Sequence, residues 1–113
     1  MMIEVKTNTG TKENAMLIAN LVVDERYAAA VNIIDVQSVY RYKGEVNICT
    51  EYQLIIKSIQ GNFNAIMSII KANHLYELPA VYATAVTKIS DEYEAWIVEN
   101  STARAAKLHD KNA

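Results

Sequence analysis

The sequence predicts an α+β fold in which three helices alternate with four strands. Apolar residues recur every second position in some segments and every third or fourth position in others, which are the periods of strands and helices. The breaks between these segments fall near the three glycines and the single proline. A length of 113 residues is typical of one domain, so these elements are expected to share one core.

The chain is expected to begin with a short strand over residues 2–6. The turn over residues 7–11 is rich in Thr and Asn, which cap helices. A helix over residues 12–26 follows, because its apolar positions keep helical spacing. These positions are Ala15, Ile18, Ala19, Val22 and Val23.

A long hairpin is predicted from residues 31–42 and 45–59, joined by a tight turn at Lys43-Gly44. The second arm alternates regularly, with Val46, Ile48, Thr50, Tyr52, Leu54 and Ile56 on one face. In the first arm the apolar phase changes after Ile33, which predicts a bulge or bend near Ile34.

The hairpin is too long for a compact subunit of this size. At about 3.3 Å per residue its longer arm spans about 50 Å, whereas a domain of this size has a radius of gyration of about 13 Å. We therefore expect the hairpin to bend or to project. A projecting hairpin with an apolar face needs a second subunit to cover it.

The second half of the chain adds a helix, a strand and a helix. Asn62 is expected to cap a helix that ends near Asn73, and an irregular connector covers residues 74–79. A strand is predicted over residues 80–88, and Ser90 or Asp91 caps the last helix. The single domain is expected to cover residues 1–108, with residues 109–113 as a mobile tail.

The resulting order, β-α-β-β-α-β-α, is the ferredoxin-like arrangement with an added C-terminal helix. Helices are expected to cover one face of an antiparallel sheet. The other face is then left for function or for a partner.

Composition excludes several classes of function. The chain is 51% hydrophobic and carries 11 Lys plus Arg against 13 Asp plus Glu, so no basic excess favours nucleic acid. No apolar run is long enough to span a membrane, and the N-terminus lacks the apolar centre of a signal peptide. One cysteine excludes an internal disulfide. We therefore expect a cytoplasmic protein without nucleic-acid or membrane partners.

Five short sequence motifs follow one another in a recognisable order along the chain. They are AAAVNII at 28–34, SVYRYKG at 38–44, IIKS at 55–58, HLYELP at 74–79 and YEAWI at 93–97. Together they resemble the CutA family of divalent-cation tolerance proteins over most of residues 3–100. The resemblance implies a homotrimer assembled through long β-hairpins, similar to the PII signalling proteins, and a link to copper and other divalent metals. It implies no enzymatic activity and no catalytic residue.

The chain departs from the family pattern at several positions. Ala30 stands at a usual cysteine, Tyr42 at a tryptophan, Leu75 at a proline and Ala80 at a glutamate. The first and last of these changes remove a thiolate and a carboxylate that could bind metal. Any copper or zinc ion is therefore expected to be weakly bound.

His74 and Glu77 are the candidate metal ligands. An imidazole and a carboxylate three residues apart can both bind a divalent cation. The alternative for His74 is a structural one, in which its ring satisfies carbonyls at the end of a helix.

Glu51, Lys57, Tyr76 and Trp96 are the candidates for ligand binding in a cleft. Lys57 could bind a small anion, or it could be a solvated or ion-paired lysine. The aromatic side chains could stack on a ligand, although aromatic residues on strands and helices more often pack in a core or an interface. Cys49 is expected to be an unreactive thiol.

Two functions follow from these observations. The first is a CutA-like homotrimer that binds a divalent cation or a small anionic ligand through clefts between subunits. The second is a PII-like sensor of small molecules that signals to a protein partner without a metal role. A third hypothesis is an enzyme that uses His74 as an acid or base and Lys57 as an electrostatic stabiliser.

Overall fold

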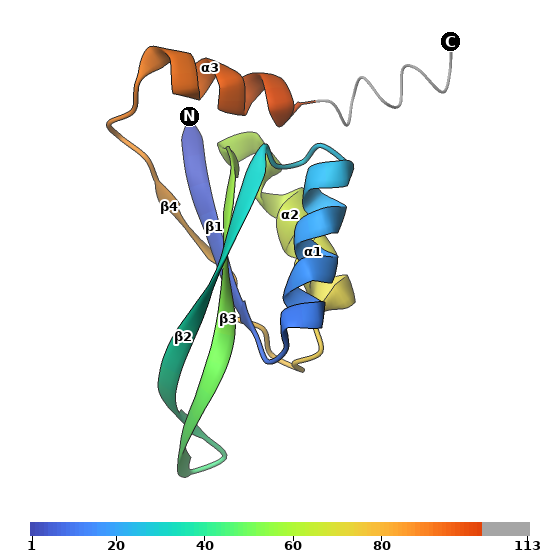
Figure 1. The fold of residues 1–113 in the computed structure, drawn as a ribbon, viewed down its shortest axis with the longest axis vertical. Helices are drawn as coiled ribbons and strands as arrows, with labels where there is room; N and C mark the ends of the chain where they lie inside the picture. Colours follow the sequence, from blue (N-terminus) through green and yellow to red (C-terminus); the bar gives the residue numbers. More distant parts are fainter. Residues whose placement is uncertain (103–113) are drawn as a thin grey trace.

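The structure, a computed structural model, describes residues 1–102. Its elements follow the predicted order (Figure 1). They are β1 (Met2–Thr9), α1 (Lys12–Asp24), β2 (Ala30–Tyr42), β3 (Glu45–Ile59), the short 3₁₀ helix η1 (Gln60–Asn62), α2 (Phe63–Asn73), β4 (Tyr82–Ala85) and α3 (Asp91–Asn100).

The four strands form one antiparallel sheet in the order β2-β3-β1-β4. The first strand of the sequence therefore lies inside the sheet, between β3 and β4. Helices α1 and α2 lie together on one face, and α3 crosses one end (Figure 1). This arrangement confirms the ferredoxin-like α+β fold.

The core lies between the sheet and the α1–α2 pair. Alternate residues of β1 and β3 point into it, because successive side chains of a strand point to opposite faces. The fully buried large apolar side chains around it are Val5, Ile18, Val22, Leu54, Ile56, Ile66 and Ile70. Burial of each contributes about 1.5–3 kcal/mol to folding.

The opposite face of the sheet, here called the open face, carries both polar and apolar side chains. The strand register places the side chains of β1 and β3 on it in rows: Glu4 beside Lys57, Lys6 beside Ile55, and Asn8 beside Gln53. Glu51 follows on β3, and Tyr82 and Thr84 extend the rows onto β4. The open face therefore carries Glu51 and Lys57, both of which the sequence suggested as ligand-binding residues.

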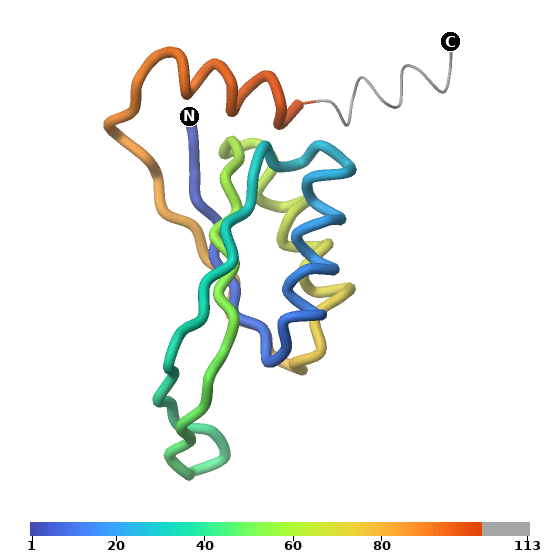
Figure 2. Tube along the Cα trace, viewed as in Figure 1, coloured from blue at the N-terminus to red at the C-terminus, as the bar shows by residue number. Residues whose placement is uncertain are grey.

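The hairpin projects as predicted. The longest dimension of the molecule is 52 Å and its radius of gyration is 15.2 Å, above the value of about 13 Å expected for a compact domain. Figure 2 shows the hairpin extending past the ends of α1 and α2. Its turn has positive φ at Lys43 (52°) and Gly44 (81°), the type I′ geometry that matches the twist of paired strands.

The bulge predicted near Ile34 is absent. The pairing of β2 with β3 continues without interruption from Ala30–Lys57 to Tyr42–Glu45. Ile33 faces the helices, and Ile34 faces the open side in ordinary alternation. The change of phase therefore marks a strand with apolar residues on both faces, not a break in pairing.

Several boundaries differ from the prediction. Strand β1 continues to Thr9, and α1 ends at Asp24, two residues earlier than expected. Strand β4 has only four residues, Tyr82–Ala85, because it pairs only with residues 3–6 of β1. Residues predicted as a tail, 109–113, lie outside the part of the chain that the structure describes.

Of the helix caps predicted for α2 and α3, the structure shows a side-chain capping bond only for α3. Ser90 caps α3 by accepting a hydrogen bond from the Tyr93 amide. Asn62 occupies the N-cap position of α2 but makes no side-chain capping bond. Its amide nitrogen instead donates to the backbone carbonyls of Tyr27 and Ser101. No helix of the described part is both long and apolar enough to cross a membrane.

Candidate functional site

The predicted site residues separate into two groups on or beside the open face. Glu51, His74 and Tyr76 come together near the point where the hairpin leaves the body of the protein. Lys57 and Trp96 lie toward the other end, where Lys57 of β3 is close to Tyr93 and Trp96 belongs to the same helix, α3. Since Glu51 and Lys57 are six residues apart on one strand, about 20 Å separates these groups.

Glu51 is a buried carboxylate with only 6% of its surface exposed. Tyr76 donates a hydrogen bond from its hydroxyl to Oε2 at 2.6 Å, and Asn8 donates from Nδ2 to Oε1 at 3.4 Å. Burial acts to raise the pKa of Glu51, but hydrogen bonds from Tyr76, Ser38 and Asn8 outweigh it and hold the pKa below its ordinary value. Glu51 is therefore an ionised group whose oxygens already have donors.

Tyr76 is the residue whose hydroxyl donates the shorter hydrogen bond to Glu51. Burial and the hydrogen bond to Glu51 raise the pKa of its hydroxyl well above the ordinary value. The hydroxyl also lies against the backbone of Gly10, where an added Cβ atom would be 3.0 Å from the oxygen. Tyr76 thus remains a neutral donor in a closely packed position.

His74 is held in one neutral tautomer by its two hydrogen bonds. Its Nε2 lies 2.7 Å from the carbonyl oxygen of Asn8, which can only accept, so Nε2 carries the proton. Its Nδ1 accepts from the backbone N–H of Tyr76 at 3.0 Å. The lone pair that a metal ion would use is therefore occupied within the chain.

The ring of His74 does not serve the carbonyls at the end of α2, which was the structural alternative expected from the sequence. It reaches β1 instead, and only its backbone N–H bonds to Ile70 of the helix. The ring fixes the position of the connector, residues 74–81, against the sheet.

Asn14 fixes the start of the same connector. From the first turn of α1 it donates to the carbonyl of Asn73 at 2.9 Å and accepts from the amide of Leu75 at 3.2 Å. The sequence analysis did not identify Asn14, Asn8 or Gly10 as part of this site. A usable signal was present for Asn14, because this polar residue lies one helical turn before Ile18 on the buried face of α1.

Glu77 follows on the connector and is exposed. Among residues 1–102, no group of three or more His, Cys, Asp or Glu side chains lies close enough to hold a metal ion. The candidate ligands His74 and Glu77 thus stay a prediction, and the described residues 1–102 bring no third ligand of these types to them.

The second group lies where Lys57 of β3 meets Tyr93 and Trp96 of α3. The Lys57 ammonium is 5.9 Å from the ring centroid of Tyr93, and that ring stacks on Trp96 with centroids 5.9 Å apart. Tyr93, which sequence reasoning did not select, thus joins Lys57 to Trp96. A cation beside two partly exposed aromatic rings can attract an anion that also has a planar group.

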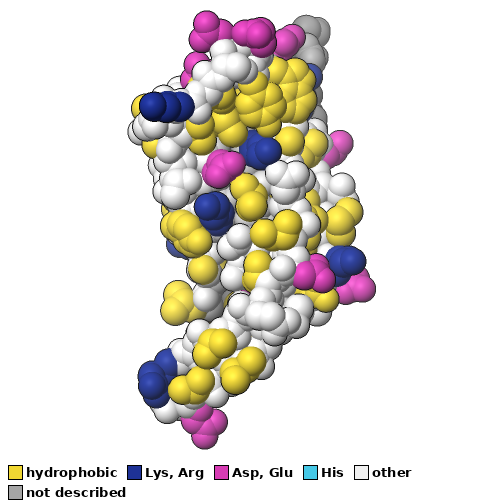
Figure 3. All heavy atoms as spheres, turned by 60° about the vertical axis from the view of Figure 1, so that its left-hand side comes forward, with side chains coloured by type: hydrophobic (Ala, Val, Ile, Leu, Met, Phe, Trp, Pro, Cys, Tyr) yellow, Lys and Arg dark blue, Asp and Glu magenta, His cyan; other side chains and the backbone are white. Residues whose placement is uncertain are grey.

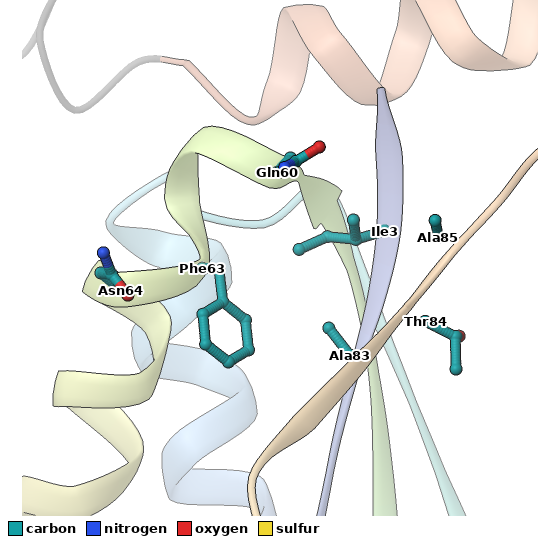
Figure 4. A pocket seen from close by; sticks show the side chains of 7 residues that line it. All are labelled: Ile3, Gln60, Phe63, Asn64, Ala83, Thr84 and Ala85. Carbon is teal, nitrogen blue, oxygen red and sulfur yellow. The ribbon is translucent and has the colours of Figure 1, made fainter.

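The surface also has a hollow of about 450 Å³ between the start of α2 and the edge strand β4. Figure 4 shows Phe63 pointing into it from α2, with Ile3 and Ala83 across from it on the sheet. None of the predicted site residues lines this hollow.

The CutA1 divalent ion tolerance protein profile matches residues 3–100. The chain is 39% identical over 92 residues, or 80% of its length, to the chloroplastic CutA protein of Arabidopsis thaliana. It spans about half of that protein's length. It is 36% identical over 92 residues to the divalent-cation tolerance protein CutA of Thermus thermophilus, covering 80% of this chain and 89% of that one.

Solved structures agree with this relationship. The Thermus thermophilus divalent cation tolerance protein superposes with a TM-score of 0.85 at 34% identity, covering 89% of this chain and 99% of that one. CutA1 from Oryza sativa gives a TM-score of 0.84 at 34% identity, covering 89% and 93%. The sequence, the fold and the order of its motifs agree, and the chain belongs to the CutA1 divalent ion tolerance protein family.

Proposed function

We propose that this protein acts in divalent-cation tolerance as a homotrimer that binds a divalent cation weakly where subunits meet. The match of residues 3–100 to the CutA1 divalent ion tolerance protein family carries the proposal. His74 and Glu77 lie on a connector that is fixed to the body of the protein, and within residues 1–102 they have no third His, Cys, Asp or Glu ligand. A cation at this position would take its further ligands from outside residues 1–102, and we propose another subunit or water as their source.

The chemistry of the connector supports weak binding. Imidazole nitrogen and carboxylate oxygen suit Cu²⁺ and Zn²⁺, with Cu²⁺ ordinarily bound more tightly. A cation on His74 must first displace the Tyr76 amide from Nδ1 or the Asn8 carbonyl from Nε2. Loss of one such hydrogen bond costs about 0.5–1.5 kcal/mol, which lowers the affinity about tenfold at the upper limit.

Calorimetric titration with Cu²⁺ and with Zn²⁺ tests the metal site. The wild-type protein should give saturable heat that is lost in His74→Ala and reduced in Glu77→Gln. His109→Ala is the matched control, because His109 is the second histidine of the chain. Unchanged binding in His74→Ala, or loss of binding in His109→Ala alone, would contradict the assignment.

Light scattering tests the assembly. A trimer has a mass three times the 12.7 kDa of one chain. The projecting hairpin with its exposed apolar side chains supports association. A mass near 12.7 kDa at micromolar concentration would contradict the trimer, whatever the outcome of the metal titration.

A second function is favoured by the group formed by Lys57 and two residues of α3. Lys57, Tyr93 and Trp96 form a cationic and aromatic surface on which a small anionic ligand with a planar group could bind, as in a PII-like sensor. A panel of nucleotides and aromatic carboxylates should then raise the melting temperature of the wild-type protein but not of Lys57→Gln. A panel without any shift in the wild-type protein would contradict this function.

A further inference from the structure

Charged and aromatic side chains meet at the α3 end of the open face. Glu4, Lys57, Tyr93 and Trp96 form this group, here called the α3-end cluster. Strand register places Glu4 of β1 directly opposite Lys57 of β3, so their Cβ atoms are about 5 Å apart. Tyr93 and Trp96 approach the same row from α3, where the Tyr93 ring centroid is 5.9 Å from the Lys57 ammonium.

Glu4 and Lys57 are neighbours that do not pair with each other. Opposite charges at directly opposed strand positions ordinarily attract one another. Within residues 1–102, however, neither side chain forms an ion pair, and the Lys57 ammonium lies over the ring of Tyr93 instead. Both side chains are half-buried. The cluster therefore holds a cation and an anion side by side, and each can still pair with a charged group of a ligand.

The aromatic rings of the cluster offer a surface to a planar group. The rings of Tyr93 and Trp96 are stacked with an interplanar angle of 19°, and the two side chains are 37% and 43% exposed. Another ring can therefore pack on their exposed surface. Figure 3 brings the open face forward and shows hydrophobic and aromatic side chains near α3, with acidic and basic side chains beside them.

The charges around the cluster are mixed in sign. The nearby cations are Lys6 in the next row of β1, Lys88 before α3 and the amine of Met1, and the nearby anions are Asp91, Glu92 and Glu94 in the first turn of α3. A polyphosphate would meet several of these carboxylates as well as Glu4, and like charges brought together in this way oppose binding. A ligand that carries one negative and one positive group matches both signs.

From these observations we propose that the α3-end cluster binds a free aromatic α-amino acid in its zwitterionic form. The ligand carboxylate pairs with the Lys57 ammonium, the ligand ammonium pairs with the Glu4 carboxylate, and the ligand ring packs on Tyr93 and Trp96. The two charged groups of an α-amino acid share one carbon atom, so a single ligand can meet two neighbouring side chains. This inference rests on the second function proposed above and narrows its ligand class by adding the ammonium group.

Titration with phenylalanine and two of its analogues tests the ligand class. 3-Phenylpropionate lacks the ammonium group and phenethylamine lacks the carboxylate, whereas both keep the ring. Trp96 is the only tryptophan of the chain, so its fluorescence reports binding beside it and none of these ligands contributes to the signal. Phenylalanine should give a saturable change in emission. Each analogue should bind about tenfold more weakly, because one charged contact is lost.

Two variants that remove a charge test the contacts. Lys57→Gln should weaken phenylalanine binding about tenfold. Glu4→Gln should bind phenylalanine no more tightly than 3-phenylpropionate, because the partner of the ligand ammonium is gone. Lys71→Gln, at an exposed lysine of α2, is the matched control and should bind all three ligands as the wild-type protein does. Circular dichroism should show a folded chain in each variant, since none of these side chains belongs to the core.

The outcomes separate this inference from the function on which it rests. Equal affinity of the wild-type protein for phenylalanine and 3-phenylpropionate would overturn the zwitterion assignment and leave a protein that binds planar anions. Wild-type discrimination in Glu4→Gln, or a response to nucleotides but not to phenylalanine, would overturn it in the same way. A wild-type protein that responds to none of these ligands would contradict the second function as well.

Discussion

Glu51 shows how one residue can combine burial with charge. Its carboxylate is stabilised by donors from β1 and from the connector, and its pKa is held below the ordinary value of 4.5. The unfolded chain therefore binds a proton at a higher pH than the folded one. The stability that this group contributes is present above its unfolded pKa and is lost as the pH falls through the lower folded pKa.

The lowered pKa of Glu51 predicts how the stability of the protein depends on pH. The melting temperature of the wild-type protein should fall on acidification below about pH 4.5, and Glu51→Gln should reduce the slope of that fall. Thermal unfolding followed between pH 7 and pH 3 measures both slopes. Glu92→Gln, an exposed carboxylate on α3, serves as the control and should retain the wild-type slope. Equal slopes for Glu51→Gln and wild type would show that Glu51 has no such linkage.

Gly10 and Gly61 form a matched pair for a second prediction. An added Cβ atom at Gly10 would lie 3.0 Å from the Tyr76 hydroxyl, whereas one at Gly61 would meet nothing within 4 Å. Because Tyr76 is held by Glu51, Gly10→Ala should lower the free energy of unfolding by about 1–3 kcal/mol. Gly61→Ala should change it by less than about 1 kcal/mol. Urea denaturation of both variants measures these changes. A large loss in Gly10→Ala indicates steric strain against Tyr76, whereas no loss indicates that the Tyr76 side chain moves aside without cost.

At the scale of elements, local patterns predicted the hairpin well. Strict alternation in β3 and the Lys43-Gly44 turn are properties of neighbouring residues, and they fixed the register of β2 with β3. The prediction of a bulge near Ile34 was wrong, because it assumed that only one face of the strand is apolar. Strand β4 was overestimated, since its length depends on pairing with β1 and not on its own composition.

The connector could not be predicted from local pattern. Its hydrogen bonds join His74 to Asn8 and Asn73 to Asn14, residues that are 66 and 59 positions apart. The alternation of β3 places Glu51 on one face of the strand. It could not show that Tyr76, 25 positions away, covers Glu51 and donates a hydrogen bond to it, because that contact joins distant parts of the chain. The sequence offered His74, Tyr76 and Glu51 as candidates without their contacts, and their role in ligand binding stays a prediction.

Asn62 carries a prediction at this scale. Its side chain links the α1–β2 loop to the end of α3 through the carbonyls of Tyr27 and Ser101. Asn62→Ala should therefore lower the free energy of unfolding by about 1–3 kcal/mol, whereas Asn64→Ala, an exposed neighbour, should have little effect.

Hydrogen exchange distinguishes this linking role from capping. In Asn62→Ala, amide protection should fall around residues 26–28 and 98–101. A loss confined to the first turn of α2 would indicate the capping role that the sequence suggested.

For the whole molecule, the core and the proposed interface are separate. The buried residues lie between the helices and the sheet, while the exposed apolar side chains of Val39, Val46 and Ile48 lie on the projecting hairpin. The monomer should consequently fold, and the trimer should add stability that depends on concentration. The wild-type melting temperature should rise with protein concentration, and that of Ile48→Asp should not. A concentration-independent wild-type value would argue against a dissociable assembly.

The central position of β1 also has a consequence for the order of folding. The hairpin closes through a two-residue turn, whereas β1 must pair with residues 52–59 and then with residues 82–85. Local contacts form faster than distant ones, because less loop entropy is lost. We expect the hairpin to form early, and a chain emerging from the ribosome cannot complete its sheet until β4 is made. The hairpin would thus be the first segment to expose apolar surface, so rapid assembly of the proposed trimer would also protect the new chain from aggregation.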